Sequence, residues 1–188
     1  MMTETIISIC LGIGLAASVG FRVFLPLFAL SLASYFDVWE LNSSWLWIGS
    51  LTAVVTFGVA TLIEILAYYI PLVDNLLDTI AIPLATIAGT AVMVSTVADL
   101  NPVVTWALAI IAGGGTAAAI KSTAGASRVT STVSTAGFGN PLISTVETGA
   151  SLIISIFSIF LPLIAFVLVI FVLFVIFKLY KKIKHSNL

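Results

Sequence analysis

The sequence predicts an all-α polytopic membrane protein with about six transmembrane or re-entrant helices. Hydrophobic residues make up 61% of the 188 residues and charged residues only 8%, whereas soluble domains carry roughly 25% charged residues. The mean hydropathy is +1.25, and several apolar runs reach the ~20 residues that a helix needs to cross a bilayer. One late segment, Gly113 to Glu147, is instead rich in Gly, Ala, Ser and Thr. We therefore expect a single transmembrane domain, residues 1–188, with a polar interior and a short basic tail at 178–188.

The first apolar run, Ile6 to Ser34, carries an arginine near its centre. Arg22 would cost about 2.5 to 3.5 kcal/mol in the middle of a bilayer unless it is paired or hydrated, so we expect it to face the bundle interior. Pro26 removes a backbone donor and favours a kink or a broken helix close to this charge. Glu64 is a candidate partner for Arg22, and a purely structural ion pair explains the two residues as well as a substrate site does.

The second span runs from about Trp45 to Tyr69 and starts at a polar turn flanked by tryptophans, which is typical of a membrane interface. Beyond it, Asp74 and Asp78 are four residues apart and share one face of a helix. Two carboxylates on one face can bind a hard cation through oxygen, but a solvated helical turn explains them too. Because no third ligand is evident, we expect no metal ion here and keep Asp74 and Asp78 as the alternative metal site.

The polar segment at 122–139 decides the predicted topology. The third and fourth spans, Ile80 to Ala98 and Val103 to about Ile120, precede it, and the last apolar stretch, Thr148 to Tyr180, follows it. Counted as a protein-enclosed fifth span, the segment gives six crossings, with both termini and the Lys121 to Arg128 turn in the cytoplasm. A re-entrant hairpin is the alternative, since irregular backbone is tolerated at depth where protein encloses it.

Four lysines near the C-terminus orient the chain. The positive-inside rule places such a basic end in the cytoplasm, so we expect a multi-pass protein of the cell inner membrane with its C-terminus inside. These lysines are Lys178, Lys181, Lys182 and Lys184. We interpret them as an orientation signal and an anchor for anionic lipids rather than as a substrate site.

Hydroxyl side chains recur every four residues within the polar segment and make one stripe along a helix. The stripe consists of Ser127, Ser131 and Thr135, and Gly137 to Pro141 then breaks the helix. A helix that is polar on every side cannot face lipid. We therefore expect this one to lie inside the bundle.

A faint internal repeat accompanies two of the basic residues. Gly14 lies eight residues before Arg22, and Gly113 lies eight residues before Lys121. With three spans before and three after, the halves would form a 3+3 inverted repeat, the arrangement with which many transporters build a site near the membrane midplane.

Three parts of the chain carry a resemblance to a known family. They are Gly14 to Pro26 (GLAASVGFRVFLP), Glu64 with Pro71, Asp74 and Asp78, and the Gly113-Gly-Gly run with Gly137 to Glu147 (GFGNPLISTVE). Together they resemble a bacterial integral-membrane family catalogued as a domain of unknown function, with Gly-x-Gly-Asn-Pro-x-x-Ser-x-x-Glu as its most specific piece. The resemblance covers nearly the whole chain and implies no activity. Where the family pattern has an Asp shortly before Pro71, this chain has Tyr69, which argues further against a metal site.

These features favour a small transporter, channel or flippase for an anionic solute or lipid phosphate. Basic side chains would bind the anion, hydroxyl and amide donors would complete the site, and two carboxylates would pair with the basic groups or couple transport. The predicted binding residues are Arg22, Lys121, Arg128, Ser127, Ser131, Thr135 and Asn140, and the predicted pairing or coupling residues are Glu64 and Glu147.

Two other functions fit the sequence. A non-transporting scaffold or a subunit of a homo-oligomer would use the glycines for tight packing and pair its charges internally, and a cation or proton carrier would use Glu64, Asp78 and Glu147. An enzyme is not expected, because the single histidine, His185, lies in the tail and no nucleophile with a base is evident. We expect no cofactor, membrane lipids as partners, and no nucleic acid, since the net charge is −1.

Overall fold

The computed structural model describes residues 2–97 and 100–186, with side chains except at 71, 72, 75, 179, 180 and 182–186. Its elements are α1 (Met2–Phe21), α2 (Phe24–Tyr35), the 3-10 helix η1 (Ser43–Gly49), α3 (Leu51–Ala67), α4 (Pro71–Thr96), α5 (Pro102–Leu108), the π-helical segment η2 (Ala109–Gly114), α6 (Gly115–Thr135), α7 (Asn140–Phe160) and α8 (Pro162–Ser186). The all-α prediction is confirmed for this part of the chain. Four of its helices are long and apolar enough to cross a membrane, or five if the bent pair η1 and α3 counts as one span.

Helix α1 forms the centre of the bundle and packs against α4, α6, α7 and α8. Small residues allow this close packing. A Cβ atom at Gly20 would lie 2.6 Å from the Cβ of Ile120 on α6, so a larger residue would push the two helices apart. Leu11, Leu15 and Val19 are fully buried on the same helix. Glycine and serine thus bring the neighbouring helices close, and the leucines fill the remaining space.

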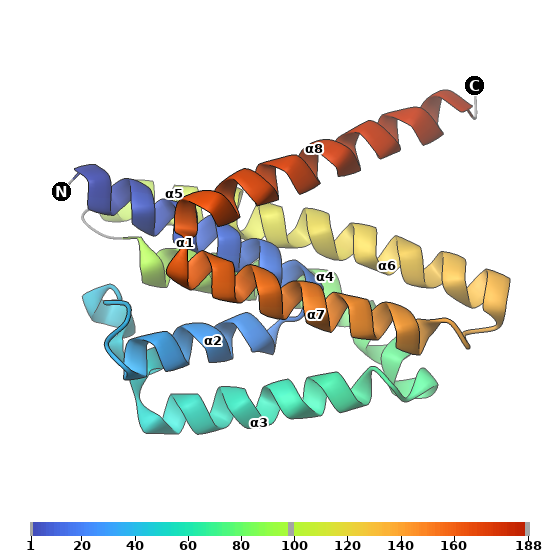
Figure 1. Cartoon of the computed structure of the whole chain (residues 1–188), viewed down its shortest axis with the longest axis horizontal. Helices are drawn as coiled ribbons and strands as arrows, with labels where there is room; N and C mark the ends of the chain where they lie inside the picture. The colour runs from blue at the N-terminus through green and yellow to red at the C-terminus, as the bar shows by residue number, and fades with distance from the viewer. Residues whose placement is uncertain (1, 98–99, 187–188) are drawn as a thin grey trace.

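The chain reverses direction between α1 and α2 (Figure 1). Gly12 on α1 lies against Met93 and Thr96 near the end of α4, and the backbone N–H of Asn42, beyond α2, donates to the carbonyl of Ser95 over 2.9 Å. The middle of α1 and the chain that follows α2 therefore both lie beside the C-terminal end of α4. The break expected near Arg22 is present, but the apolar run from Ile6 to Ser34 is a hairpin of two helices rather than one interrupted span.

A carboxylate caps the start of α2. The two oxygens of Glu64, on α3, accept the backbone N–H groups of Val23 over 2.8 Å and Phe24 over 2.9 Å. These N–H groups have no partner within the new helix, and burying them unpaired would cost about 1 to 3 kcal/mol each. Glu64 thus stabilises the helix break inside the bundle.

Residues Pro102–Thr135 form one continuous helical segment that is apolar enough to cross the membrane once. The Lys121 to Arg128 turn and the separate crossing or re-entrant hairpin expected at 122–139 are therefore wrong. The glycines before Lys121 do not break the helix, because they serve contact with α4: a Cβ at Gly113 would lie 2.6 Å from the carbonyl oxygen of Gly89. The hydroxyls that follow bond to carbonyls of their own helix, as Ser122 Oγ does to Ala118 over 2.7 Å, so they require no polar interior.

The two ends of the described chain lie at opposite ends of the bundle (Figure 1). Helix α7 runs antiparallel to α1, since Ser158 contacts Gly14 and Ser151 contacts Ser18, and α8 then returns toward the end that holds the α3–α4 connection. An arrangement with both termini at one face, as six crossings require, is not what the bundle shows. The 3+3 inverted repeat stays a prediction. The side chains of Lys182, Lys184 and His185 lie outside the described part.

Candidate functional site

Seven ionisable side chains gather around the ring of Tyr68, inside the half of the bundle that holds the α3–α4 and α6–α7 connections. They are Arg22, Glu64, Asp74, Asp78, Lys121, Arg128 and Glu147, and together with Tyr68 we call them the Tyr68 cluster. Arg22, Arg128 and Lys121 are the three largest fully buried side chains. Buried ionisable groups in a membrane protein indicate a functional site by default.

Three cations surround the ring of Tyr68. The Cζ atoms of Arg22 and Arg128 lie 4.2 and 4.3 Å from the ring centroid, and the Nζ atom of Lys121 lies 5.1 Å from it. Lys121 Nζ also donates to the tyrosine hydroxyl over 3.1 Å. Desolvated contacts of this kind contribute up to about 2 kcal/mol each. Tyr68 is not among the site residues predicted from the sequence, although its position four residues after Glu64 places both on one face at the C-terminal end of α3.

Arg128 is neutralised by two carboxylates. Its Nε donates to Glu147 Oε1 over 3.1 Å, its Nη2 donates to Glu147 Oε2, and its Nη1 donates to Asp74 Oδ1. Asn140 Nδ2 supports this arrangement by donating to Asp74 Oδ2 over 3.1 Å. Bidentate pairs of this geometry are the strong ones among charged hydrogen bonds. Arg128, Glu147 and Asn140, all predicted site residues, are therefore brought together, but as a closed ion-pair network.

Arg22 has only neutral partners. Its Nε donates to Thr148 Oγ1 over 3.0 Å, and its Nη2 donates to the carbonyl of Ser144 over 2.9 Å and to the hydroxyl of the same residue. Its Nη1 is buried and has no hydrogen-bond partner among the described residues. Among the described residues Arg22 forms no hydrogen-bonded ion pair with Glu64 or Glu147, because the broken helix occupies the first carboxylate and Arg128 occupies the second. Both carboxylates nevertheless lie close enough to attract its charge.

The cluster contains one more carboxylate than it has basic groups, with four of the former and three of the latter. The Oδ1 atom of Asp78 is buried and has no hydrogen-bond partner among the described residues. The Oδ1 atom of Asn140 also lacks a donor. Asp74 and Asp78 do not form a metal site with a third carboxylate, histidine or cysteine anywhere in the described ranges, and Asp74 is already bound to Arg128.

The hydroxyl stripe lies outside the Tyr68 cluster. The buried face of this part of α6 consists of Lys121, Ala124 and Arg128, while Ser127 and Thr135 are exposed and Ser131 is half-buried. Ser127 Oγ and Thr135 Oγ1 each donate to a carbonyl of their own helix over 2.7 Å. The prediction that the stripe faces the interior is therefore wrong, because a helix needs only one buried face.

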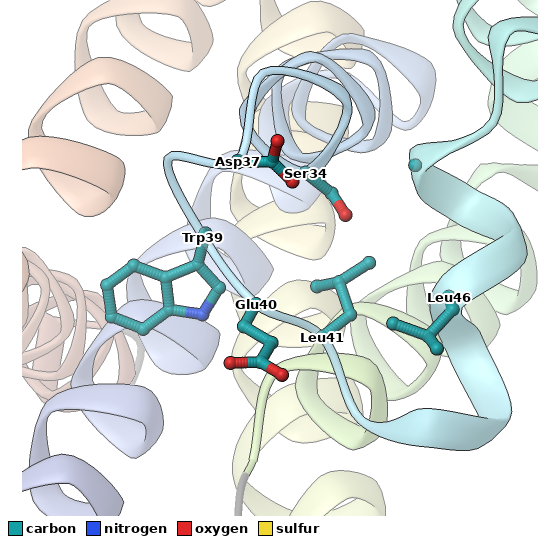
Figure 2. A pocket seen from close by; sticks show the side chains of 7 residues that line it. Ser34, Asp37, Trp39, Glu40, Leu41 and Leu46 are labelled. Atoms are coloured by element: carbon teal, nitrogen blue, oxygen red, sulfur yellow. The ribbon is translucent and has the colours of Figure 1, made fainter.

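One cavity reaches the cluster and two larger ones do not. A space of about 220 Å³ between α2, α3 and α4 is lined in part by Glu64 and Tyr68. Cavities of about 400 and 720 Å³ lie at the other end of the bundle, around the loop after α2. Figure 2 shows the first of these two, where Asp37, Trp39 and Glu40 of the loop surround the opening. The ionisable side chains that line these two cavities are Glu4, Asp37 and Glu40, and no lysine or arginine of the described ranges lines either of them to bind an anion.

Comparison with known proteins identifies a family but no activity. The family model described as "Domain of unknown function (DUF4126)" matches residues 9–182. No curated protein and no solved structure matches the chain. The match confirms the resemblance to a family of unknown function, while the Gly-x-Gly-Asn-Pro signature and the bacterial origin stay predictions.

Proposed function

The chain belongs to this family of unknown function, and we propose that it is a small membrane transporter or flippase that binds the anionic group of its substrate at Arg22. The observation that carries the proposal is the Nη1 atom of Arg22, which is buried in the bundle and has no hydrogen-bond partner among the residues that the structure describes. An unpaired donor on a buried charged group costs at least 1 to 3 kcal/mol or so. A phosphate or carboxylate would remove this cost, because a guanidinium presents its donors in a planar fork that matches two oxygens.

The position of Arg22 supports transport over a purely structural role. The residue lies at the break between α1 and α2. Glu64 of α3 caps the start of α2 at this break and so joins the α1–α2 hairpin to α3. Transporters commonly build their sites from such broken helices. A scaffold would instead be expected to neutralise every buried charge, as the fold does for Arg128.

The distribution of basic residues suggests an orientation. All Lys and Arg residues outside the Tyr68 cluster lie at 178–184, whereas Glu4, Asp37 and Glu40 lie at the other end of the bundle. We place the α8 end in the cytoplasm by the positive-inside rule, and hence the N-terminus outside the inner membrane. In a Cys10→Ala background, a cysteine at Thr3 should label from outside and a tag after Leu188 should be reached only from inside. Access to both from one side would overturn this topology.

A conservative substitution tests the anion site. Arg22→Lys keeps the charge but loses the fork, so it should weaken binding of inorganic phosphate or acetate by roughly tenfold, or about 1.4 kcal/mol. Binding is measured as anion-dependent thermal stabilisation of the purified protein, with Lys178→Gln as the control that should bind like the wild type. If no anion stabilises the protein, or if only calcium or magnesium does so, the proposal fails.

A proton or cation carrier is the second candidate, favoured by Asp78. The four carboxylates and three basic groups of the Tyr68 cluster leave a formal charge of −1 when all are ionised. A proton or one monovalent cation on Asp78 would balance that charge and give its buried oxygen a partner. Asp78→Asn should then abolish proton-dependent or sodium-dependent stabilisation and leave anion binding unchanged.

A further inference from the structure

The cavity of about 220 Å³ beside the Tyr68 cluster is mostly apolar. Eight of its ten lining residues are hydrophobic, and the two exceptions are Glu64 and Tyr68. The hydrophobic lining consists of Val23 and Phe24 on the α2 side, Ala60, Ile63 and Ala67 of α3, and Leu77, Ala81 and Leu84 of α4. Apolar cavities of this kind favour hydrocarbon over water.

The cavity and the guanidinium of Arg22 meet at the same aromatic ring. Tyr68 lines the cavity, and the Cζ atom of Arg22 lies 4.2 Å from the centroid of its ring. Val23, the residue that follows Arg22, is also part of the lining. A ligand with an anionic group at Arg22 would therefore have apolar space within reach of its other end.

The cavity lies beside an apolar outer surface of the bundle. Helix α3 packs against α2 and η1, whereas α4 packs against α1, α6 and η2, so α3 and α4 flank the cavity without close contact along their length. The neighbouring surface is apolar: Ile63 is 62% exposed and Ile80 on α4 is 55% exposed. A hydrocarbon chain could thus enter sideways from the bilayer without crossing a polar surface.

We propose that the substrate is an amphipathic anion drawn from the bilayer, with a phosphate or carboxylate headgroup on Arg22 and an alkyl chain in the α2–α3–α4 cavity. The proposal rests on the anion site described under Proposed function. Glu64 is the one carboxylate of the cavity lining and disfavours an anionic headgroup inside the cavity itself. Its oxygens are held by the N–H groups of Val23 and Phe24, so it has no need of a ligand itself.

Short alkyl phosphates test the proposal in lipid nanodiscs. Affinity should rise from methyl to butyl to hexyl phosphate, by about fourfold for each methylene that enters the cavity. Ala81→Leu should fill the cavity and abolish this rise while methyl phosphate binds as before. Ala119→Leu, an equal enlargement on an exposed alanine of α6, is the matched control and should leave the rise intact.

Leu77→Ala and Arg22→Lys separate the two ways in which the proposal can fail. Leu77→Ala enlarges the cavity without overpacking, so it should shift the preferred chain length upward, and it replaces Ala81→Leu if that variant does not fold. If neither cavity variant alters the dependence on chain length, the amphipathic substrate is wrong while the anion site stands. If Arg22→Lys binds every alkyl phosphate as the wild type does, both the anion site and the amphipathic substrate are wrong.

Discussion

Arg22 and Arg128 contact the same tyrosine ring but are held in opposite ways. Both are buried, and their Cζ atoms lie 4.2 and 4.3 Å from the centroid of Tyr68. Arg128 bonds two carboxylates, whereas Arg22 bonds two hydroxyls and a carbonyl and keeps Nη1 unpaired. The fold neutralises the charge of Arg128, whereas it only buries that of Arg22.

The difference arises from where each residue sits along its helix. Arg128 lies within α6, and the adjoining helices α4 and α7 supply Asp74 and Glu147. Arg22 lies at a break, and there the carboxylate that could have paired with it, Glu64, is engaged by backbone N–H groups. A broken helix therefore leaves Arg22 without a hydrogen-bonded carboxylate among the described residues, which is a means of building an anion site inside a membrane protein.

The largest effect on stability is expected from Arg128→Leu. The substitution leaves Asp74 and Glu147 without their shared partner, and breaking a buried pair in this way costs about 3 to 5 kcal/mol. The unfolding free energy in mild detergent measures it. Combining Arg128→Leu with Glu147→Gln and Asp74→Asn should restore part of the loss. Wild-type stability for the single variant would mean that the Arg128 network does not stabilise the fold.

Glu64→Ala should have the next largest effect, because it removes the cap of α2. The N–H groups of Val23 and Phe24 would lose their acceptors, at about 1 to 3 kcal/mol for each buried group. Glu64→Gln keeps one acceptor oxygen and should lose less. Equal unfolding free energies for the two variants would show that capping is not what Glu64 contributes.

Arg22→Leu should change stability by only about 1 kcal/mol or less, since the loss of its hydrogen bonds to neutral partners is offset by the removal of a buried donor that has no partner among the described residues. The same variant should lose all phosphate-dependent stabilisation. Arg22→Leu should thus keep the fold and lose phosphate binding, whereas Arg128→Leu should destabilise the fold. A loss of stability as large as that of Arg128→Leu would place Arg22 among the structural charges.

Composition and the cost of buried charge were enough to predict much of the site. An all-helical chain and a broken helix near Arg22 followed from placing charges and prolines in apolar surroundings. Lys121 and Arg128 were expected at a cytoplasmic turn and are instead buried within α6. Which carboxylate binds which group could not be predicted from the sequence. The two N–H groups that Glu64 accepts become available only where the helix breaks. Which cation receives which carboxylate depends on helix register, which the sequence does not state.

The topology failed at the polar half of α6 for a related reason. Hydropathy treats each Ser and Thr as a group that requires a polar surrounding, and so places a turn near Lys121. In the structure Ser122 and Thr123 donate to carbonyls of their own helix, and the intervening alanines favour helix. The segment therefore continues straight to Thr135, with its basic residues on one buried face.

The smallest effect is expected from Ser127→Ala, on the hydroxyl stripe next to the most strongly paired charge. Ser127 is exposed and its Oγ donates only to the carbonyl of Ala124 over 2.7 Å, so its removal should change the unfolding free energy by less than about 0.5 kcal/mol. Anion-dependent stabilisation should also be unchanged, because Arg22 lies at the break between α1 and α2 and uses other hydroxyls. Thr148→Val, which removes an acceptor of Arg22, is the matched comparison and should weaken binding. If Ser127→Ala weakens phosphate binding as much as Arg22→Lys does, the anion passes along the exposed face of α6 rather than through the Tyr68 cluster.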